Sequence, residues 1–236
     1  MDNQHSIFHR TILLIGEDNF KKISRKKVIV FGVGGVGSWC AESLIRSGVR
    51  NLTLVDYDSV AESNINRQLP ANSLTIGRSK VDVMREHLLA INPEIDITII
   101  HQAYNQETAA SFQLGMYDYV IDAIDSVKDK ALLIRSACES RTILFSSMGA
   151  ALKSDTTKIK VGEFWKITYD PLARALRQRF KKDGMPALKF QCVYSEERLK
   201  NSIPDKANGT LMHVTASFGL TLAGLVIRDI TLPLTS

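Results

Sequence analysis

The chain has 236 residues, which suits one α/β domain with a small appendage and is too short for two full-sized domains. Hydrophobic residues make up 44% of it and charged residues 23%, so a disordered or a fibrous protein is excluded. The net charge of +5 permits a polyanionic partner without requiring one.

Membrane attachment and export are not expected. No run reaches the roughly 18 consecutive apolar residues of a membrane helix, and the polar opening MDNQHSIFHR lacks the apolar core of a signal peptide. The three cysteines, Cys40, Cys138 and Cys192, are odd in number and far apart, which suits a reducing compartment without disulfides. We therefore expect a cytoplasmic protein.

Residues 26–147 alternate short apolar runs with helical periods, a pattern that predicts parallel strands joined by right-handed helical crossovers. The first strand is expected at 28–31, followed by a helix with Ser38 as its N-cap and Gly48 at its end. The remaining expected elements of this part are the strands 51–56, 95–100, 117–124 and 142–147 and the helices 79–91 and 127–139.

From residue 148 the pattern becomes less regular. Strands are expected at 159–164 and 190–194, on either side of a helix that begins at Asp170-Pro171. A polar and mobile loop, 198–209, then precedes an apolar helix, 213–230, whose small residues suit close packing in the core or a dimer interface.

These elements together predict a single α/β domain spanning 1–236. Its core, 26–147, is expected to be a Rossmann-like, doubly wound, mainly parallel sheet of about six to eight strands in all. The C-terminal portion, 148–236, is expected to be a less regular α+β part that serves the substrate or a dimer.

The glycine cluster after the first strand carries the first chemical signal. Gly32, Gly34 and Gly37 satisfy G-x-G-x-x-G between a strand and a helix, so backbone N–H groups and the helix N-terminus can face a phosphate. Asp56, at the end of the next strand, is placed to accept hydrogen bonds from ribose hydroxyls. The alternative is that the glycines only form a tight turn.

Polar side chains at later strand ends favour ATP over a nicotinamide dinucleotide. Arg67 and Lys80, with the carboxylate of Asp125, make a poor hydride-transfer pocket but suit a triphosphate with Mg²⁺. A nicotinamide-dependent dehydrogenase stays open, as does the interpretation of Arg67 and Lys80 as solvated surface charges. Asp125 could also be the N-cap of the helix expected at 127–139.

Five motifs in this order, GVGGVG, DYDSV, SNINRQ, GRSK and DAIDS, resemble the adenylating superfamily of ubiquitin-activating enzyme and of the bacterial activators of thiamine and molybdopterin sulfur carriers. Within that superfamily, FHRTILLIGEDNFKKI, GVGSW, DAIDSVKDK, DPLARALRQRF and CVYSEE are similar to the bacterial tRNA threonylcarbamoyladenosine dehydratases. The second resemblance covers nearly the whole chain.

The resemblance implies a role for each matching position. It implies that Asp56 holds the ATP ribose, that Asn64, Arg67 and Lys80 contact the phosphates, and that Asp125 coordinates Mg²⁺. The full set of nucleotide-binding positions is then Gly32, Gly34, Gly35, Gly37, Asp56, Asp58, Asn64, Arg67, Gln68 and Lys80. Arg10 is implied to reach the partner's phosphates across a homodimer, although an arginine in such a segment is ordinarily just a surface residue.

The activity implied is ATP-dependent dehydration of threonylcarbamoyladenosine at position 37 of tRNA. The threonyl carboxylate would be adenylated with release of pyrophosphate, and the ureido part of the same modification would displace AMP and close a ring. A tRNA partner and a possible sulfurtransferase-type protein partner follow from the same resemblance. A nucleotide-binding scaffold without turnover is a non-enzymatic alternative.

The cysteine pattern bears on the main alternative, an activator of a ubiquitin-like sulfur carrier. Such activators typically carry two C-x-x-C pairs for a structural zinc, and this sequence has neither. Cys192 stands beside VYSEE, but a buried strand cysteine is the expectation. Catalysis through a cysteine thioester is therefore not expected.

The helix expected at 170–184 has a cationic side. It contains no acidic residue between Asp170 and Asp183 and carries Arg174, Arg177, Arg179, Lys181 and Lys182. Arg177, Lys181 and Lys182 are expected to contact RNA phosphates. The alternatives are a solvated helix face without a partner, or an RNA surface on the loop that carries Arg198, Lys200 and Lys206.

Overall fold

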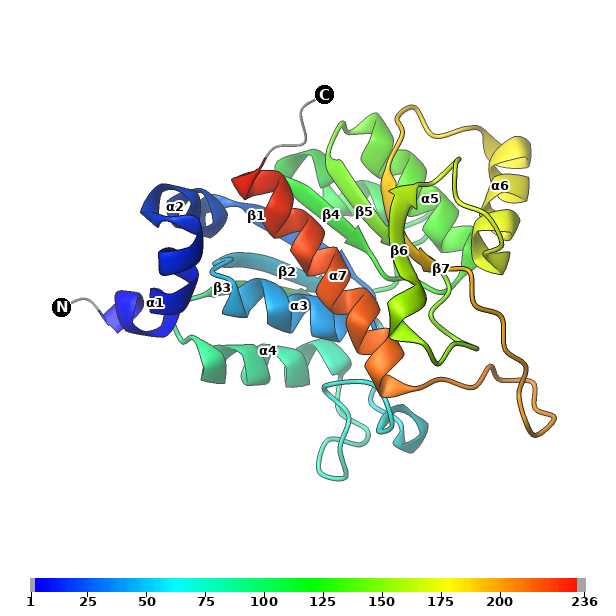
Figure 1. Cartoon of the computed structure of the whole chain (residues 1–236), viewed down its shortest axis with the longest axis horizontal. Coiled ribbons are helices and arrows are strands. Elements are labelled where there is room, and N and C mark those ends of the chain that lie inside the picture. Colours follow the sequence, from blue (N-terminus) through cyan, green and yellow to red (C-terminus); the bar gives the residue numbers. More distant parts are fainter. Residues whose placement is uncertain (1–2, 233–236) are drawn as a thin grey trace.

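The computed structural model describes residues 3–232, with side chains described from residue 7 onward. Its centre is a seven-stranded sheet in the order β3-β2-β1-β4-β5-β7-β6 (Figure 1). The strands are β1 (Lys27–Phe31), β2 (Asn51–Val55), β3 (Asp96–Ile100), β4 (Tyr119–Asp122), β5 (Ile143–Ser147), β6 (Ile159–Glu163) and β7 (Gln191–Ser195). All neighbouring pairs are parallel except the antiparallel pair β6–β7.

Helices cover both faces of this sheet. They are α1 (Asn3–Ile15), α2 (Glu17–Arg25), α3 (Gly37–Arg46), α4 (Lys80–Ile91), α5 (Val127–Glu139), α6 (Pro171–Asp183) and α7 (Met212–Thr231). Residues of α3, α4 and α7 share one buried apolar cluster, and residues of α5 and α6 share another. The doubly wound, mainly parallel α/β fold expected from the sequence is therefore confirmed.

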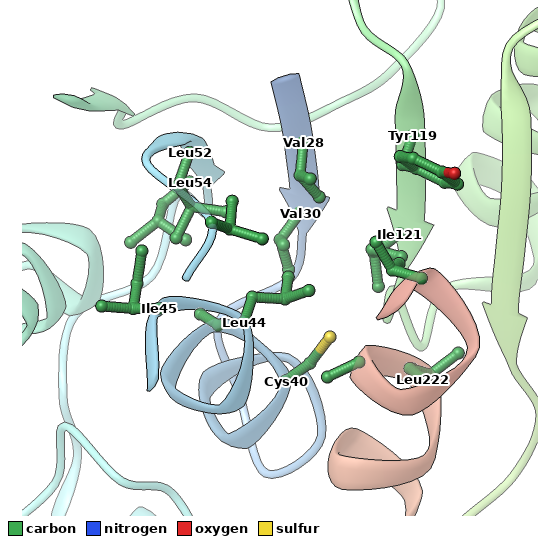
Figure 2. Packing of buried hydrophobic residues seen from close by; sticks show 14 of the residues in the cluster. Val28, Val30, Cys40, Leu44, Ile45, Leu52, Leu54, Tyr119, Ile121 and Leu222 are labelled. Carbon is green, nitrogen blue, oxygen red and sulfur yellow. The ribbon is translucent and has the colours of Figure 1, made fainter. Parts of the chain in front are cut away.

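The first strand shows why the sheet needs two helical layers. Val28 and Val30 belong to the cluster on the α3 side, whereas Ile29 and Phe31 belong to the other cluster. Successive side chains of a strand point to opposite faces, so a strand with four consecutive buried apolar residues must be covered on both. Figure 2 shows the α3 layer of this packing, with Leu44 beside Val30.

The order of the strands determines where a ligand can bind. β1 lies between β2 and β4. The chain runs from β1 through α3 to β2 on one side and returns later to β4 on the other, so the strand order reverses at β1. In such sheets the crevice outside the carboxyl ends of the strands, where the strand order reverses, is the usual ligand site. The segments after β1, β2 and β4 meet there.

Several predicted boundaries were wrong by a few residues. The strand expected at 117–124 is only Tyr119–Asp122, because a 3₁₀ turn at Leu114–Met116 precedes it and the chain leaves the ladder after Asp122. Ser38 is not an N-cap: α3 begins at Gly37, and the Ser38 hydroxyl donates a hydrogen bond of 2.6 Å to the Gly34 carbonyl. The helix predicted at 127–139 has those bounds in the structure.

The apolar helix α7 is a core helix of the sheet. It is the one helix of the described chain that is long and apolar enough to cross a membrane, yet 56% of its most apolar window is buried. It packs on α3, and a side chain at Gly219 would collide with the Val36 carbonyl. Gly219 therefore serves the close helix packing that the sequence predicts, whereas a Cβ on Gly224 would meet nothing within 4 Å.

Candidate active site

A cavity of about 870 Å³ lies at the carboxyl ends of β1, β2 and β4. The glycine loop forms part of its wall, through Gly32, Gly34 and Gly35. Gly32 has a φ of +85°, and a Cβ there would lie 2.7 Å from the Ala123 carbonyl oxygen. A Cβ on Gly37 would overlap the Gly32 carbonyl oxygen. These two glycines are therefore required by the backbone conformation of the loop.

Asp56 fastens the glycine loop to the end of β2. Its side chain is almost fully buried, and its Oδ2 accepts a hydrogen bond of 2.6 Å from the Val33 N–H. Its Oδ1 accepts one of 2.9 Å from the Asp58 N–H. Each carboxylate oxygen retains a second lone pair, so Asp56 can also accept from a hydroxyl of a ligand in the cavity.

The two cations predicted for the site both line the cavity. Lys80 is only 4% exposed and forms an ion pair of 2.7 Å with Asp58. Arg67 is half-buried, and its guanidinium donates to the Ser63 carbonyl and the Asn66 side chain at 2.9 and 2.8 Å. The interpretation of Lys80 as a solvated surface charge is therefore wrong, because this side chain is almost fully buried.

Asp125 also lines the cavity, in the turn that follows β4. Its side chain is exposed in the cavity and makes no hydrogen bond or ion pair with any described residue. The N-cap of α5 is Ser126, whose hydroxyl accepts from the Asp129 N–H, so the capping alternative for Asp125 is wrong. A free carboxylate at this place suits a cation shared with phosphates.

Four carboxylates act on Tyr57, which lines the same cavity. The pKa of Tyr57 is raised by Asp58 most strongly, then by burial, and then by Asp125, Asp56 and Asp129. Mg²⁺ uses one or two carboxylates together with substrate phosphates and water, so the free carboxylate of Asp125 fits this ion.

Asn64 and Gln68 complete the phosphate side of the cavity. The Asn64 Oδ1 accepts from the Ala61 N–H, which leaves its amide N–H groups available. The Gln68 Oε1 is buried without a hydrogen-bond partner among the described residues. Its Nε2 would lie 3.6 Å from a Cβ on Gly34, so this amide lies against the glycine loop.

A buried ion pair beneath the site was missed by the sequence analysis. Lys130 and Asp122 are both fully buried and lie 2.8 Å apart, and Ser146 donates a hydrogen bond of 2.6 Å to the same carboxylate oxygen. Lys130 also donates to the Ile124 carbonyl at 3.0 Å. This network shapes the turn that carries Asp125. The motif DAIDSVKDK contains both residues, but a lone helix lysine is ordinarily on the surface.

The cavity continues beyond the nucleotide-binding motifs. Its far wall comes from the C-terminal portion, mainly residues 147–153, Pro171, Leu172 and 197–199. The buried residue Lys153 belongs to this wall and was also missed, because an isolated lysine between GAAL and SDTT gives no sequence signal.

Arg10 is not among the described residues that line the cavity. It is an exposed residue on α1. Within the described part of this chain, no contact brings Arg10 to the site, so a role there would need a second copy of the chain.

The cysteines are all buried. Burial raises the pKa of the Cys192 thiol to about 12, so it is a thiol at neutral pH. Burial likewise raises the pKa of Cys40 and of Cys138. Among the described residues, no group of three His, Cys, Asp or Glu side chains is arranged to hold a metal ion.

The cationic helix differs from its prediction at Arg177. Its guanidinium donates to the Phe164 and Ile167 carbonyls at 2.5 and 2.7 Å and lies over the Phe164 ring. Arg177 is thus committed to the fold and is not a free phosphate contact. Lys181 and Lys182 are exposed, as predicted.

Comparison with known proteins agrees with this geometry. The model of the ThiF family matches residues 8–233. The tRNA threonylcarbamoyladenosine dehydratase of Haemophilus influenzae is 40% identical over 96% of this chain and 94% of its own length. The crystal structure of the Escherichia coli tRNA N6-threonylcarbamoyladenosine dehydratase with ATP superimposes with a TM-score of 0.91 at 35% identity, covering 98% of this chain and 96% of that one.

A more distant relative is an adenylyltransferase. The molybdopterin-synthase adenylyltransferase of E. coli is 30% identical over 78% of this chain and 72% of its own length. The match to the family model spans nearly the whole chain, including the glycine loop and both walls of the cavity. This protein belongs to the ThiF family.

Proposed function

We propose that this protein is an ATP-dependent tRNA threonylcarbamoyladenosine dehydratase. The observation that carries the proposal is one cavity with two different walls. One wall has the glycine loop, Lys80, Arg67 and Asp125, and the other belongs to the C-terminal portion. The similarity to the H. influenzae and E. coli dehydratases over nearly the full chain supports the same substrate.

The chemistry begins with a carboxylate, which is a poor electrophile until its oxygen is converted into a leaving group. The threonyl carboxylate attacks the α-phosphorus of ATP, pyrophosphate leaves, and an acyl adenylate forms. The ureido group of the same modification then attacks the acyl carbon, AMP leaves, and a ring closes with net loss of one water. The nucleophile is part of the substrate, so no protein nucleophile is needed.

The residues of this chain hold ATP in place and neutralise the charge of its phosphates. The glycine loop and the N-terminus of α3 face the phosphates, and Asp56 is the proposed partner of the ribose. Lys80 and Arg67 offset the negative charge that grows on the transferred phosphoryl group. Asp125 is the proposed ligand of Mg²⁺, which when bound neutralises phosphate charge. Asn64 and Gln68 supply amide groups to the same phosphates.

The proposal extends to partners and location. The substrate is a tRNA that carries threonylcarbamoyladenosine at position 37, and the active form is a homodimer in which Arg10 reaches the other subunit's phosphates. A sulfurtransferase-type partner and a cytoplasmic location belong to the same proposal.

The test is to incubate the protein with ATP, Mg²⁺ and tRNA bearing threonylcarbamoyladenosine, digest the RNA and weigh the nucleosides. Loss of one water from that nucleoside, with AMP and pyrophosphate in equal amounts, is expected. An unchanged nucleoside together with adenylation of a small protein ending in Gly-Gly would favour the sulfur-carrier alternative. That alternative rests on the 30% identical adenylyltransferase.

A further inference from the structure

The far wall of the cavity contains a buried cation that the nucleotide-binding motifs do not use. Lys153 is 5% exposed and lies in the loop between β5 and β6. Its ammonium donates hydrogen bonds to two backbone carbonyls, those of Ser195 at 3.1 Å and Glu197 at 2.8 Å. An ammonium has three N–H donors, so one remains.

This ammonium has no anionic partner within ion-pair distance among the described residues. The Glu197 carboxylate binds the two residues that follow Lys153 instead. It accepts hydrogen bonds from the N–H groups of Ser154 and Asp155 at 2.9 Å each. The Asp170 carboxylate caps α6 through the Ala173 N–H at 2.9 Å. Its other oxygen is buried and has no hydrogen-bond partner in the described chain, so it does not reach Lys153.

Two carbonyl dipoles are weak compensation for a buried charge. Burial lowers the pKa of Lys153, against the opposing influence of Asp170 and Glu197. Buried charges in proteins are as a rule paired, because removing an ion from water is unfavourable unless a partner compensates for the lost hydration. A cation in a cavity wall that lacks a protein anion is suited to bind an anion brought by a ligand.

The substrate of the proposed reaction brings one such anion besides phosphate. The threonyl carboxylate must lie beside the α-phosphate of ATP when it reacts, and hence in the same cavity as Lys80 and Asp125. Lys153 lines that same cavity. Phosphates of ATP already have Lys80 and Arg67.

We propose that Lys153 binds the threonyl carboxylate of the tRNA modification and selects for its free, ionised form. This inference rests on the proposed function and adds a substrate-binding residue on the C-terminal wall. A purely structural lysine would tie the Ser195 and Glu197 carbonyls together without responding to the charge of the substrate.

The test compares two ligands that differ in that charge and by one methyl group. One is an anticodon stem-loop RNA with threonylcarbamoyladenosine, and the other is the same RNA with the carboxylate as a methyl ester. Binding of each is measured by fluorescence anisotropy in the presence of a non-hydrolysable ATP analogue. The wild-type protein should prefer the acid by roughly 10- to 100-fold, the value of a charge-assisted hydrogen bond.

Two variants remove the cation in different ways. Lys153→Met removes every donor, whereas Lys153→Gln keeps an amide that can still bind the backbone carbonyls and so protects the fold. Both should lose the preference for the acid and retain the affinity for the ATP analogue. Lys158→Met, an exposed lysine nearby that does not line the cavity, is the matched control and should keep the preference.

The outcomes separate this inference from the proposed function. If the wild-type protein dehydrates the modified RNA but binds the acid and the ester equally well, Lys153 does not select for the ionised carboxylate. The same conclusion follows if either folded variant keeps the preference for the acid. If the wild-type protein does not dehydrate the RNA at all, the proposed function itself fails, and the inference fails with it.

Discussion

The two walls of the cavity are built in different ways. The nucleotide wall, with the glycine loop, Lys80, Arg67 and Asp125, stands at the ends of three hydrogen-bonded parallel strands, and two of its glycines cannot be replaced without a collision. The C-terminal wall consists mainly of loops, and Lys153 is held there by two hydrogen bonds to backbone carbonyls. The first wall is fixed by the sheet, whereas the second depends on individual side chains.

This difference explains how one scaffold serves related reactions. The glycine loop and the charges around the phosphates are suited to any carboxylate adenylation. We propose that the C-terminal wall decides which carboxylate is presented. Variants of the first wall should therefore abolish adenylation, and variants of the second should change substrate selection.

The largest effect is expected beneath the nucleotide wall. Lys130→Met leaves the Asp122 carboxylate buried without its cation and should lower the free energy of unfolding by about 3–5 kcal/mol. Lys128→Met, on the exposed side of the same helix, should change it by less than about 0.5 kcal/mol. Urea unfolding measures both, and a decrease below about 1 kcal/mol for Lys130→Met would show that the pair does not hold this wall.

Removing charge from the nucleotide wall should abolish turnover. Lys80→Ala and Asp125→Ala should each reduce AMP and pyrophosphate formation by at least roughly 100- to 1000-fold, because charge compensation at the phosphates is removed. Circular dichroism should be unchanged for Asp125→Ala, since Asp125 makes no hydrogen bond or ion pair with other described residues. Activity within tenfold of wild type at saturating Mg²⁺ would remove that residue from the mechanism.

A mixing experiment tests whether the nucleotide wall is completed by a second subunit. Arg10→Ala and Asp125→Ala should each be inactive, yet exchange of their subunits should restore roughly one quarter of wild-type activity. Half of the dimers in an equal mixture are hybrids, and each hybrid has one intact site. No recovery in verified hybrids would refute the role of Arg10 across the dimer and leave ATP use untouched.

On the C-terminal side, neighbouring cations of α6 should behave in opposite ways. Lys181→Ala with Lys182→Ala should flatten the salt dependence of log K for tRNA by about 0.7 to 0.9 for each phosphate that is no longer neutralised. Arg177→Ala should instead lower stability by about 1–3 kcal/mol, because two backbone carbonyls lose their donor. An unchanged salt slope for the lysine pair would move the RNA surface to Arg198, Lys200 and Lys206.

The smallest effect is expected from the cysteines. Replacing Cys40, Cys138 and Cys192 with alanine should leave dehydration intact, since the Cys192 thiol is protonated at neutral pH and the ring closes on a nucleophile of the substrate. Mass spectrometry of the nucleosides provides the readout. Normal adenylation without ring closure in a folded variant would point to a covalent intermediate.

The glycine loop and the helix after β4 could be predicted because each has a local cause, whereas Lys80, Arg67 and Asp125 were assigned from the motifs of the family resemblance. The strand–glycine–helix order requires Gly32 and Gly37, and the helix expected at 127–139 has the observed bounds. Lys130 and Lys153 could not be found, because a lysine is ordinarily exposed and only the tertiary fold buries these two. The prediction that Arg177 contacts RNA phosphates was wrong, because nothing in the local sequence shows that its guanidinium binds two backbone carbonyls.

The central claim is that the two walls bring the α-phosphate of ATP and the threonyl carboxylate together. Substrate RNA labelled with ¹⁸O in both carboxylate oxygens tests it directly. Attack on the α-phosphorus followed by ring closure must leave one ¹⁸O in AMP and one in the cyclic nucleoside. Unlabelled AMP formed alongside the cyclic product, or label in inorganic phosphate with ADP, would contradict carboxylate adenylation in this cavity.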